Sequence, residues 1–255
     1  MLAIAGYHII EQLYASAHSI VYRARRSADN APVVLKVLRE EYPPPEEIAR
    51  FRREYEMTRQ LNPSTSSGQG VEGVITVYGL ETHQHTFVMA LEDFGGESLT
   101  RLLPTHPFQL DEFLRLAIRI TEILGQIHQR HVMHKDLNPS NIVWNPATDQ
   151  LKIIDFGIST ELSREQPEIR NPEMLEGTLA YLSPEQTGRM NRAIDYRTDF
   201  YSLGVTFYHL LTGQLPFQAE DALELVHCHL AQMPMPPCDL PLLGGGRGGS
   251  PNILS

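Results

Sequence analysis

Two carboxylates and an amide stand in a fixed order near the middle of the chain, where they could serve one reaction. Asp136 and Asn141 lie in the run His-Lys-Asp-Leu-Asn-Pro-Ser-Asn at 134–141, and Asp155 opens the Asp-Phe-Gly that comes 19 residues after Asp136. Phosphoryl transfer from ATP suits such a set, because its loose transition state needs positioning and charge neutralisation rather than covalent attack. Asp136 would accept or orient the acceptor hydroxyl, while Asn141 and Asp155 offer the hard oxygen ligands that Mg²⁺ prefers.

A cation that could hold the phosphates stands at Lys36, which ends the apolar run Val-Val-Leu-Lys. The β-branched residues of this run favour a strand. Glu54 follows 18 residues later within a helical pattern, and we expect it to pair with Lys36 and to orient it. Glu56 and Glu47 on the same predicted helix are the alternatives, and the helix-face pattern favours Glu54.

The elements that position these groups change character along the chain. Strand-like runs bounded by turn residues occur at 9–13, 19–24, 32–38, 74–80 and 86–91. Helical periodicity occurs at 46–61 and again from residue 110 onward. This order predicts an α+β chain with a small, sheet-rich part followed by a mostly helical part. Residues 62–70, which are rich in Ser, Gly, Asn and Pro, predict a flexible surface insertion.

The ordered set of motifs resembles the eukaryotic-type protein kinase domain. Further motifs carry the likeness: Gly177-Thr178 and Ser183-Pro184-Glu185 resemble the end of the activation segment, and residues 199–204 resemble the start of the buried central helix. Order and spacing agree from about residue 5 to about residue 235. The resemblance implies a two-lobed kinase fold, with an antiparallel-sheet N-lobe plus one helix at 1–93 and a mostly helical C-lobe at 94–238.

The resemblance also assigns roles in a Mg²⁺ and ATP site between the lobes. It makes Asp136, Lys36 and Glu54 catalytic, and Asn141 and Asp155 metal ligands. Asp199 would brace the backbone of the catalytic loop. The residues implied at the nucleotide are Leu13, Val21, Val34, Lys36, Leu91, Glu92, Phe94, Asn141, Val143 and Asp155. Among them the hinge backbone at Glu92 and Phe94 would touch ATP, and Leu91 would guard the back of the pocket.

The implied activity is that of an ATP-dependent protein serine/threonine kinase in bacterial signalling, with protein Ser and Thr hydroxyls as acceptors. Thr178 resembles the substrate-positioning residue of that type. The wording of residues 151–217 further resembles the kinase module at the N-terminus of very large bacterial, often cyanobacterial, signalling proteins. Those proteins continue into an ATPase-like region, a GAF domain and a histidine kinase, so further domains of one parent polypeptide are expected as partners.

The loop that should cover the phosphates departs from the family pattern G-x-G-x-x-G-x-V. Alignment on Val21 places Tyr14, Ser16 and Ser19 at the three glycine positions. Glycines let backbone amides approach phosphate, so a loop without them is less free to close. Nucleotide affinity or turnover is therefore expected to be affected.

Two other departures concern the catalytic loop and the end of the chain. Asn138 stands where Ser/Thr kinases carry a lysine that stabilises the moving phosphoryl charge, and Lys135 holds the arginine position of H-R-D. The Gly-rich residues 243–250 predict a disordered tail at 239–255, which leaves the C-lobe without sequence for its last helices. These departures favour an alternative, a pseudokinase-like nucleotide-binding regulatory or scaffold module, whereas the retained acid and metal-ligand residues favour the enzyme.

Composition sets the remaining expectations. The chain has 255 residues, 42% of them hydrophobic, which is enough for a full core. A net charge of −10 argues against nucleic-acid binding, and the one dense basic run, 50–53, is interpreted as a solvated helix face. Two cysteines give no disulfide framework, and the pattern contains neither a secretory leader nor a membrane span. We therefore expect a cytoplasmic domain.

Overall fold

The computed structural model describes residues 4–62, 70–83, 85–161, 179–189 and 192–240. The predicted insertion at 62–70 and the predicted tail at 239–255 lie almost entirely outside the described residues, as does Thr178. All statements below concern the described part of the chain.

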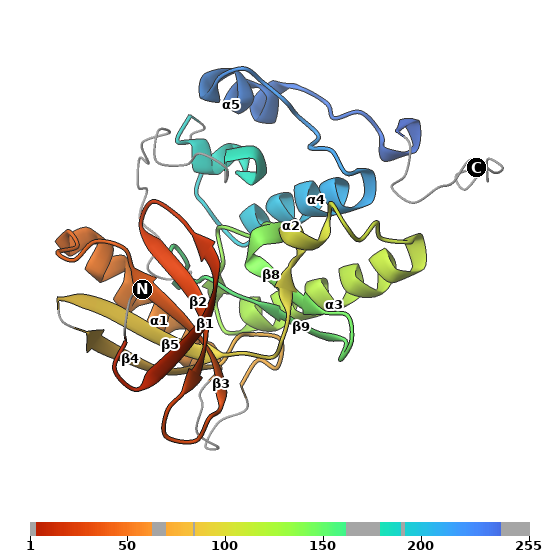
Figure 1. Ribbon diagram of the computed structural model, residues 1–255. Helices are drawn as coiled ribbons and strands as arrows, with labels where there is room; N and C mark the ends of the chain where they lie inside the picture. Colours follow the sequence, from red (N-terminus) through yellow and green to blue (C-terminus); the bar gives the residue numbers. More distant parts are fainter. Residues whose placement is uncertain (1–3, 63–69, 84, 162–178, 190–191, 241–255) are drawn as a thin grey trace.

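The first part of the chain forms an antiparallel sheet of five strands in the order β1-β2-β3-β5-β4 (Figure 1). The strands are β1 Tyr7–Ala15, β2 Ser19–Arg26, β3 Pro32–Leu38, β4 Val77–His83 and β5 Thr86–Glu92. The strand predicted from residue 74 begins three residues later than expected. The reason is that Val74 forms an isolated bridge with Ile153, and the N–H of Ile75 donates to the carbonyl of Ile153 over 3.2 Å.

The two faces of this sheet are buried against different partners. On β3, Val33, Leu35 and Val37 are buried in one apolar cluster, as expected from the two-residue period of a strand. The opposite face packs against helix α1, Pro45–Leu61, in a second cluster that includes Phe51 and Met89. Pro45 stands at the first helical position, where its missing N–H costs nothing, so the predicted helix is extended by one residue.

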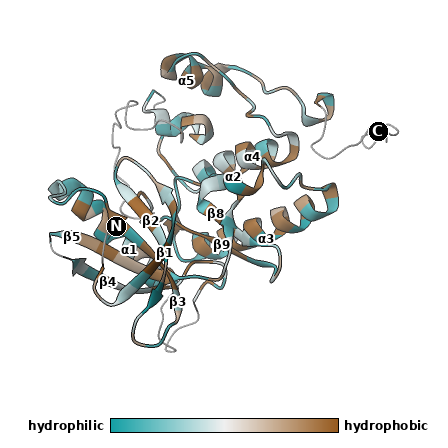
Figure 2. Cartoon of the chain, viewed as in Figure 1, coloured by the Kyte–Doolittle hydropathy of each residue, from teal (hydrophilic) through white to brown (hydrophobic). Residues whose placement is uncertain are grey.

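The second part of the chain is mostly helical. Its helices are α2 Leu99–Leu102, α3 Leu110–Gln129, α4 Arg197–Thr212 and α5 Ala222–Ala231, with 3₁₀ turns η1 Pro139–Asn141, η4 Leu179–Tyr181, η5 Pro184–Thr187 and η6 Pro237–Asp239. Small sheets join β6 Glu97–Ser98 with β8 Ile142–Asn145 and β9 Gln150–Ile153, and β7 Val132–Met133 with β10 Thr160–Glu161. Polar and apolar bands alternate along α3 (Figure 2), whose buried residues are Phe113, Leu116, Ile120, Ile123, Leu124 and Ile127.

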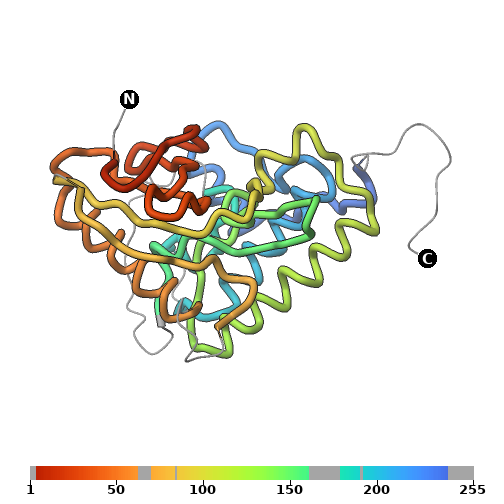
Figure 3. The backbone as a smooth tube through the Cα atoms, turned by 60° about the horizontal axis from the view of Figure 1, so that its bottom comes forward, coloured from red at the N-terminus to blue at the C-terminus, as the bar shows by residue number. Residues whose placement is uncertain are grey.

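The sheet-rich part and the helical part form two lobes. Figures 1 and 3 show the N-terminal strands and α1 at one end of the molecule and α3 and α4 toward the other. The predicted α+β, two-lobed architecture is therefore confirmed. None of the helices in the described part of the chain has the length and apolarity that a membrane span requires.

Candidate active site

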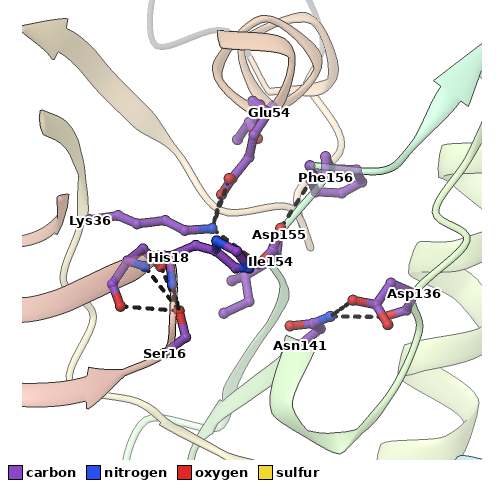
Figure 4. Close-up of polar contacts among 12 residues, drawn as sticks. Ser16, His18, Lys36, Glu54, Asp136, Asn141, Ile154, Asp155 and Phe156 are labelled. Atoms are coloured by element: carbon purple, nitrogen blue, oxygen red, sulfur yellow. Dashed lines mark hydrogen bonds and ion pairs between the residues drawn. The ribbon is translucent and has the colours of Figure 1, made fainter. Parts of the chain in front are cut away.

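Three charged side chains from three different elements meet between the lobes. The ammonium of Lys36 on β3 lies 2.7 Å from both carboxylate oxygens of Glu54 on α1, and 3.0 Å from Oδ2 of Asp155 (Figure 4). Side-chain exposure is 14% for Lys36 and 8% for Glu54, so the pair is largely removed from water. The structure thus places Lys36 against Glu54, and neither Glu56 nor Glu47 occupies that position.

One cation, Lys36, faces the two carboxylates of Glu54 and Asp155. As a result, the pKa values of these two carboxylates differ widely. Burial disfavours the charged lysine, but the charges of Asp155 and Glu54 prevail and raise the pKa of Lys36. Burial also opposes the ionised form of Asp155, yet Lys36 outweighs it and lowers the pKa of Asp155 to about 2. Burial and the neighbouring charge of Asp155 raise the pKa of Glu54 to about 7. The site therefore holds a fixed positive charge beside a fully ionised Asp155.

The carboxylate of Asp136 is held by two side-chain amides. Asn141 Nδ2 donates to Asp136 Oδ2 over 3.1 Å and to its carbonyl oxygen over 2.8 Å. Asn138 Nδ2 donates to Asp136 Oδ1 over 3.0 Å, while its own Oδ1 accepts the N–H of Ser140 and caps η1. Burial, with a further contribution from the charge of Asp155, raises the pKa of Asp136 to about 7. A carboxylate with that pKa can take up a proton near neutral pH.

The backbone before Asp136 is braced from two other parts of the chain. Asp199 on α4 accepts the N–H of His134 over 2.9 Å and that of Lys135 over 2.7 Å. Gln186 on η5 donates its side-chain amide to the carbonyl of Lys135 over 2.8 Å. These bonds hold Lys135 at a φ of 67°, a left-handed conformation that costs a non-glycine residue about 1 to 3 kcal/mol. The brace by Asp199 is the role that the family resemblance implied.

The tautomer of His134 follows from its two hydrogen bonds. The N–H of Asp136 donates to His134 Nδ1 over 3.3 Å, so the proton lies on Nε2, which donates to the carbonyl of Ile154 over 3.0 Å. Burial lowers the pKa of His134 and keeps it neutral in this role. The ring therefore links the loop that carries Asp136 to the residue immediately before Asp155.

Four of the expected nucleotide-binding residues share one face of the N-lobe sheet. Val21 is paired with Lys36, and Val34 with Leu91, across antiparallel strands. Paired residues project to the same side, so these four side chains lie on the face of Lys36. Leu13 falls at a register shift between Gln12 and Tyr14, so the ladder does not place it on this face.

The predicted hinge residues lie where the chain passes from β5 toward β6. The N–H of Glu92 donates to the carbonyl of Thr76 over 3.0 Å, and the carbonyl of Phe94 accepts from Asn145 Nδ2 over 2.7 Å. A Cβ at Gly96 would stand 2.5 Å from the Phe94 ring and 2.7 Å from Val143 Cγ1. Phe94 and Val143 therefore converge on a position where only glycine fits.

The loop between β1 and β2 replaces glycine freedom with a serine turn. Ser16 Oγ accepts the N–H of His18 over 3.2 Å and that of Ser19 over 3.0 Å, and the N–H of Ser16 donates to the carbonyl of Ser19 over 2.8 Å. Such a turn satisfies backbone groups that a glycine-rich loop would leave for a ligand. The loop is thus closed on itself.

Sequence reasoning did not assign Arg50 to the site. It lies one turn before Glu54 on α1, and its Nε is 3.3 Å from the position that a Cβ on Gly157 would take. Its charge helps to lower the pKa of Asp155 and offsets part of the rise in the pKa values of Asp136 and Glu54, though less than the nearer groups do. The i, i+4 spacing between Arg50 and Glu54 could have indicated that Arg50 lies near the site. The basic run at 50–53 obscured this signal, because such a run is typical of a solvated helix face.

The donor set fits Mg²⁺ and a nucleotide phosphate chain. Because Asn141 uses its Nδ2 for Asp136, its amide oxygen is left on the other side as a hard ligand. The backbone carbonyl of Asn141 accepts the N–H of Ile154 over 2.9 Å, which ties this residue to the segment carrying Asp155. Oxygen ligands of this kind, with a lysine beside them, are what Mg²⁺-bound phosphates require.

Comparison with known proteins points to one family. A family model described as the protein kinase domain matches residues 7–239. The chain is 32% identical over 229 residues to serine/threonine-protein kinase pkn3 of Myxococcus xanthus, an alignment that covers 85% of this chain and 39% of that protein. It is 33% identical over 224 residues to serine/threonine-protein kinase A of Synechocystis sp., covering 82% and 41% of the two chains. For serine/threonine-protein kinase PknB of Mycobacterium tuberculosis the identity is 29% over 237 residues, covering 91% and 36%. The chain thus spans less than half the length of these relatives.

Proposed function

Since the chain belongs to the protein kinase domain family, we propose that it is the catalytic domain of a protein serine/threonine kinase that transfers the γ-phosphoryl group of Mg²⁺-ATP to protein hydroxyls. The observation that carries the proposal is the assembled charge set. Lys36 is fixed by Glu54 at 2.7 Å and touches Asp155 at 3.0 Å, while Asp136 stands on the adjoining loop.

Each group has a chemical task in this proposal. Lys36 would hold the α and β phosphates, and Asn141 and Asp155 would hold Mg²⁺, which neutralises charge on the phosphates when bound. Asp136 would orient the acceptor hydroxyl and take its proton, a role that its pKa of about 7 suits near neutral pH. Val21, Val34, Leu91, Phe94 and Val143 would form the apolar surroundings of the adenine.

A second candidate is a pseudokinase-like module that binds nucleotide and regulates other domains. The specific observation in its favour is the serine turn, because Ser16 occupies the amides of His18 and Ser19. Amides used in this way are lost as phosphate ligands unless the turn opens. The two candidates differ in turnover and not in whether the site binds ATP.

Two measurements test the proposal in order. Mg²⁺-ATP should raise the melting temperature of the chain, since a ligand that binds the native state stabilises it, and Asp155→Ala should abolish the Mg²⁺-dependent part of the rise. Transfer of labelled γ-phosphate to a generic protein substrate should then be lost in Asp136→Asn. A thermal shift without any transfer would favour the second candidate, and no shift at millimolar nucleotide would contradict both.

The wider assignments also stand as proposals. We propose an N-lobe at 1–93, a C-lobe at 94–238 and a tail at 239–255, within a longer cytoplasmic signalling polypeptide. The free state of Cys228 and Cys238 supports a reducing compartment. The relatives, which are longer than this chain, support further domains. Sequencing the gene beyond codon 255 tests this directly.

A further inference from the structure

The tip of the phosphate-covering loop is tied to helix α1. His18 Nδ1 lies 2.5 Å from Glu47 Oε1, across 29 residues of sequence. Because a carboxylate only accepts, the proton lies on Nδ1 and the imidazole donates to Glu47 whatever its charge. The other oxygen of this carboxylate, Glu47 Oε2, is buried and finds no hydrogen-bond partner among the described residues. Among the described residues, His18 is thus the hydrogen-bond donor to this partly buried carboxylate.

The same loop is anchored to the end of β3 by Arg39. The N–H of Arg39 donates to the carbonyl of His18 over 2.9 Å, and its guanidinium donates to the carbonyl of Ser16 over 3.1 Å. Together with the internal turn made by Ser16, these contacts leave the tip few alternative positions. The loop is held from three sides, by its own serine, by β3 and by α1.

Glu47 and Glu54 belong to the same face of α1. They are seven residues apart, and two helical turns bring residues at that spacing almost into line. Glu54 binds Lys36 and Glu47 binds His18, so one helix face carries both the orienting partner of the phosphate-binding lysine and the anchor of the phosphate-covering loop. A displacement of the loop therefore acts on the same rigid element that positions Lys36.

We infer that the His18–Glu47 pair is a latch that couples the glycine-free loop to helix α1, so that His18 is a positioning residue for the Lys36–Glu54 ion pair. In this chain the latch fixes the position of the loop between β1 and β2. In the family pattern, flexible glycines and contacts with the phosphates determine that position. The inference rests on the proposed function only where it concerns nucleotide; the coupling itself is a property of the free chain.

Hydrogen exchange of the chain without nucleotide tests the coupling. His18→Ala and Glu47→Ala should each accelerate amide exchange both in residues 14–20 and in the first turns of α1, and the double variant should add little to either single one, as expected for partners. The matched controls are His8→Ala on β1 and Glu46→Ala, which removes a first-turn side chain of α1 but not the latch. Faster exchange in the loop alone, or the same effect from Glu46→Ala, would overturn the inference.

Nucleotide affinity supplies the second readout. A partly exposed pair of this kind, with His18 45% exposed, should be worth about a two- to fivefold change in the Kd of Mg²⁺-ATP when broken. His18→Lys places a hydrogen-bond donor opposite Glu47 again and should keep most of the affinity. If the wild type binds nucleotide and His18→Ala binds it equally well, the latch has no role in the site. If the wild type binds none, the proposed function fails while the exchange experiment still decides the coupling.

Discussion

The side-chain amide of Asn138 donates to Oδ1 of Asp136 over 3.0 Å, and the oxygen of the same amide caps the following 3₁₀ turn. The position two residues after the candidate base is therefore occupied by a neutral donor that holds the carboxylate in place. By the family pattern alone, Asn138 stands in the place of a lost cation. The structure shows that it also has a positive role, which any substitution there removes.

Asn138→Lys is expected to shift the acidic limb of the pH–activity profile to lower pH. A cation beside Asp136 favours its charged form, and so opposes the burial that raises its pKa to about 7. Asn138→Ala removes a hydrogen bond that lowers the pKa of Asp136 and adds no charge. The acidic limb of its pH–activity profile should therefore move to higher pH. The measurement is kcat/KM for phosphoryl transfer from about pH 5.5 to about pH 8.5. If the acidic limbs of the wild type and the two variants coincide, residue 138 does not affect the pKa of Asp136.

Asp136→Asn is expected to abolish transfer and to stabilise the fold above neutral pH. The pKa of Asp136 is raised to about 7 from 3.8, so between these values the native state holds more protons than the unfolded chain. The free energy of unfolding of the wild type therefore falls as the pH rises through this window. The variant lacks that fall, which gives it an advantage of about 1 to 3 kcal/mol at pH 8 that vanishes near pH 4.

Urea midpoints at the two pH values check this difference. Asp29→Asn is the control of opposite sign, since the hydrogen bond that Arg26 donates to Asp29 lowers the pKa of Asp29, and the wild type loses that contribution only on acidification. An Asp136→Asn protein that is less stable than the wild type at pH 8 would mean that the carboxylate is ionised there without cost.

Lys36→Met is expected to destabilise the fold by about 3 to 5 kcal/mol at neutral pH, because it leaves two carboxylates without their shared cation. The pKa of Asp155, lowered to about 2 by Lys36 against the effect of burial, gives the pH dependence. Its stabilising contribution is full above the unfolded value of 3.8 and is lost as the pH falls toward 2, so the deficit should shrink in acid.

Lys152→Met offers the matched comparison, because Lys152 pairs with the single carboxylate of Glu92. Denaturant unfolding of the wild type and both variants at pH 7 and pH 3 gives the six free energies needed. A loss from Lys36→Met no larger than that from Lys152→Met would contradict the view that the shared ion pair is costly to break.

The exposed stripe on α3 is expected to drive self-association. Leu110, Leu114 and Ile118 follow one another at four-residue spacing and are 40%, 49% and 58% exposed. Replacing Leu114 and Ile118 with Gln should lower light scattering at high protein concentration and change stability by only about 0.5 kcal/mol. Leu124→Ala, on the buried face of the same helix, should instead cost about 2 to 5 kcal/mol. If the double variant and the wild type scatter light equally, the stripe does not drive self-association.

The sequence was most informative where a local hydrophobic period, of a strand or of a helix, determines the secondary structure. The strand pattern around Val34 and Lys36 and the helical pattern around Glu54 placed each group on an element, and the structure brings Lys36 and Glu54 together at 2.7 Å. The start of β4 was wrong by three residues, because the backbone near Val74 bridges to Ile153 in the other lobe. A tertiary contact of this kind does not appear in the hydrophobic periodicity of the sequence.

Contacts between a turn and a distant element were beyond sequence reasoning. The sequence pattern makes Glu47 an alternative partner of Lys36 and does not indicate its bond to His18, because that bond depends on how Ser16 folds the loop. Gln186 likewise reaches the carbonyl of Lys135 across 51 residues. Pairings of this sort follow from the packed backbone and not from residue type or spacing.

The brace that Asp199 provides has a consequence for the order in which the chain acquires its structure. Asp199 reaches His134 and Lys135 across 65 and 64 residues, so the loop carrying Asp136 can be fixed only after α4 has docked. Closing so long a loop has an entropic cost, which slows the formation of contacts as distant in sequence as these. A nascent chain that has emerged only as far as residue 190 would contain every residue from His134 to Asp155 and still lack their native geometry. Competence for phosphoryl transfer would then arise during synthesis only once α4 has left the ribosome, long after its chemical groups have been made.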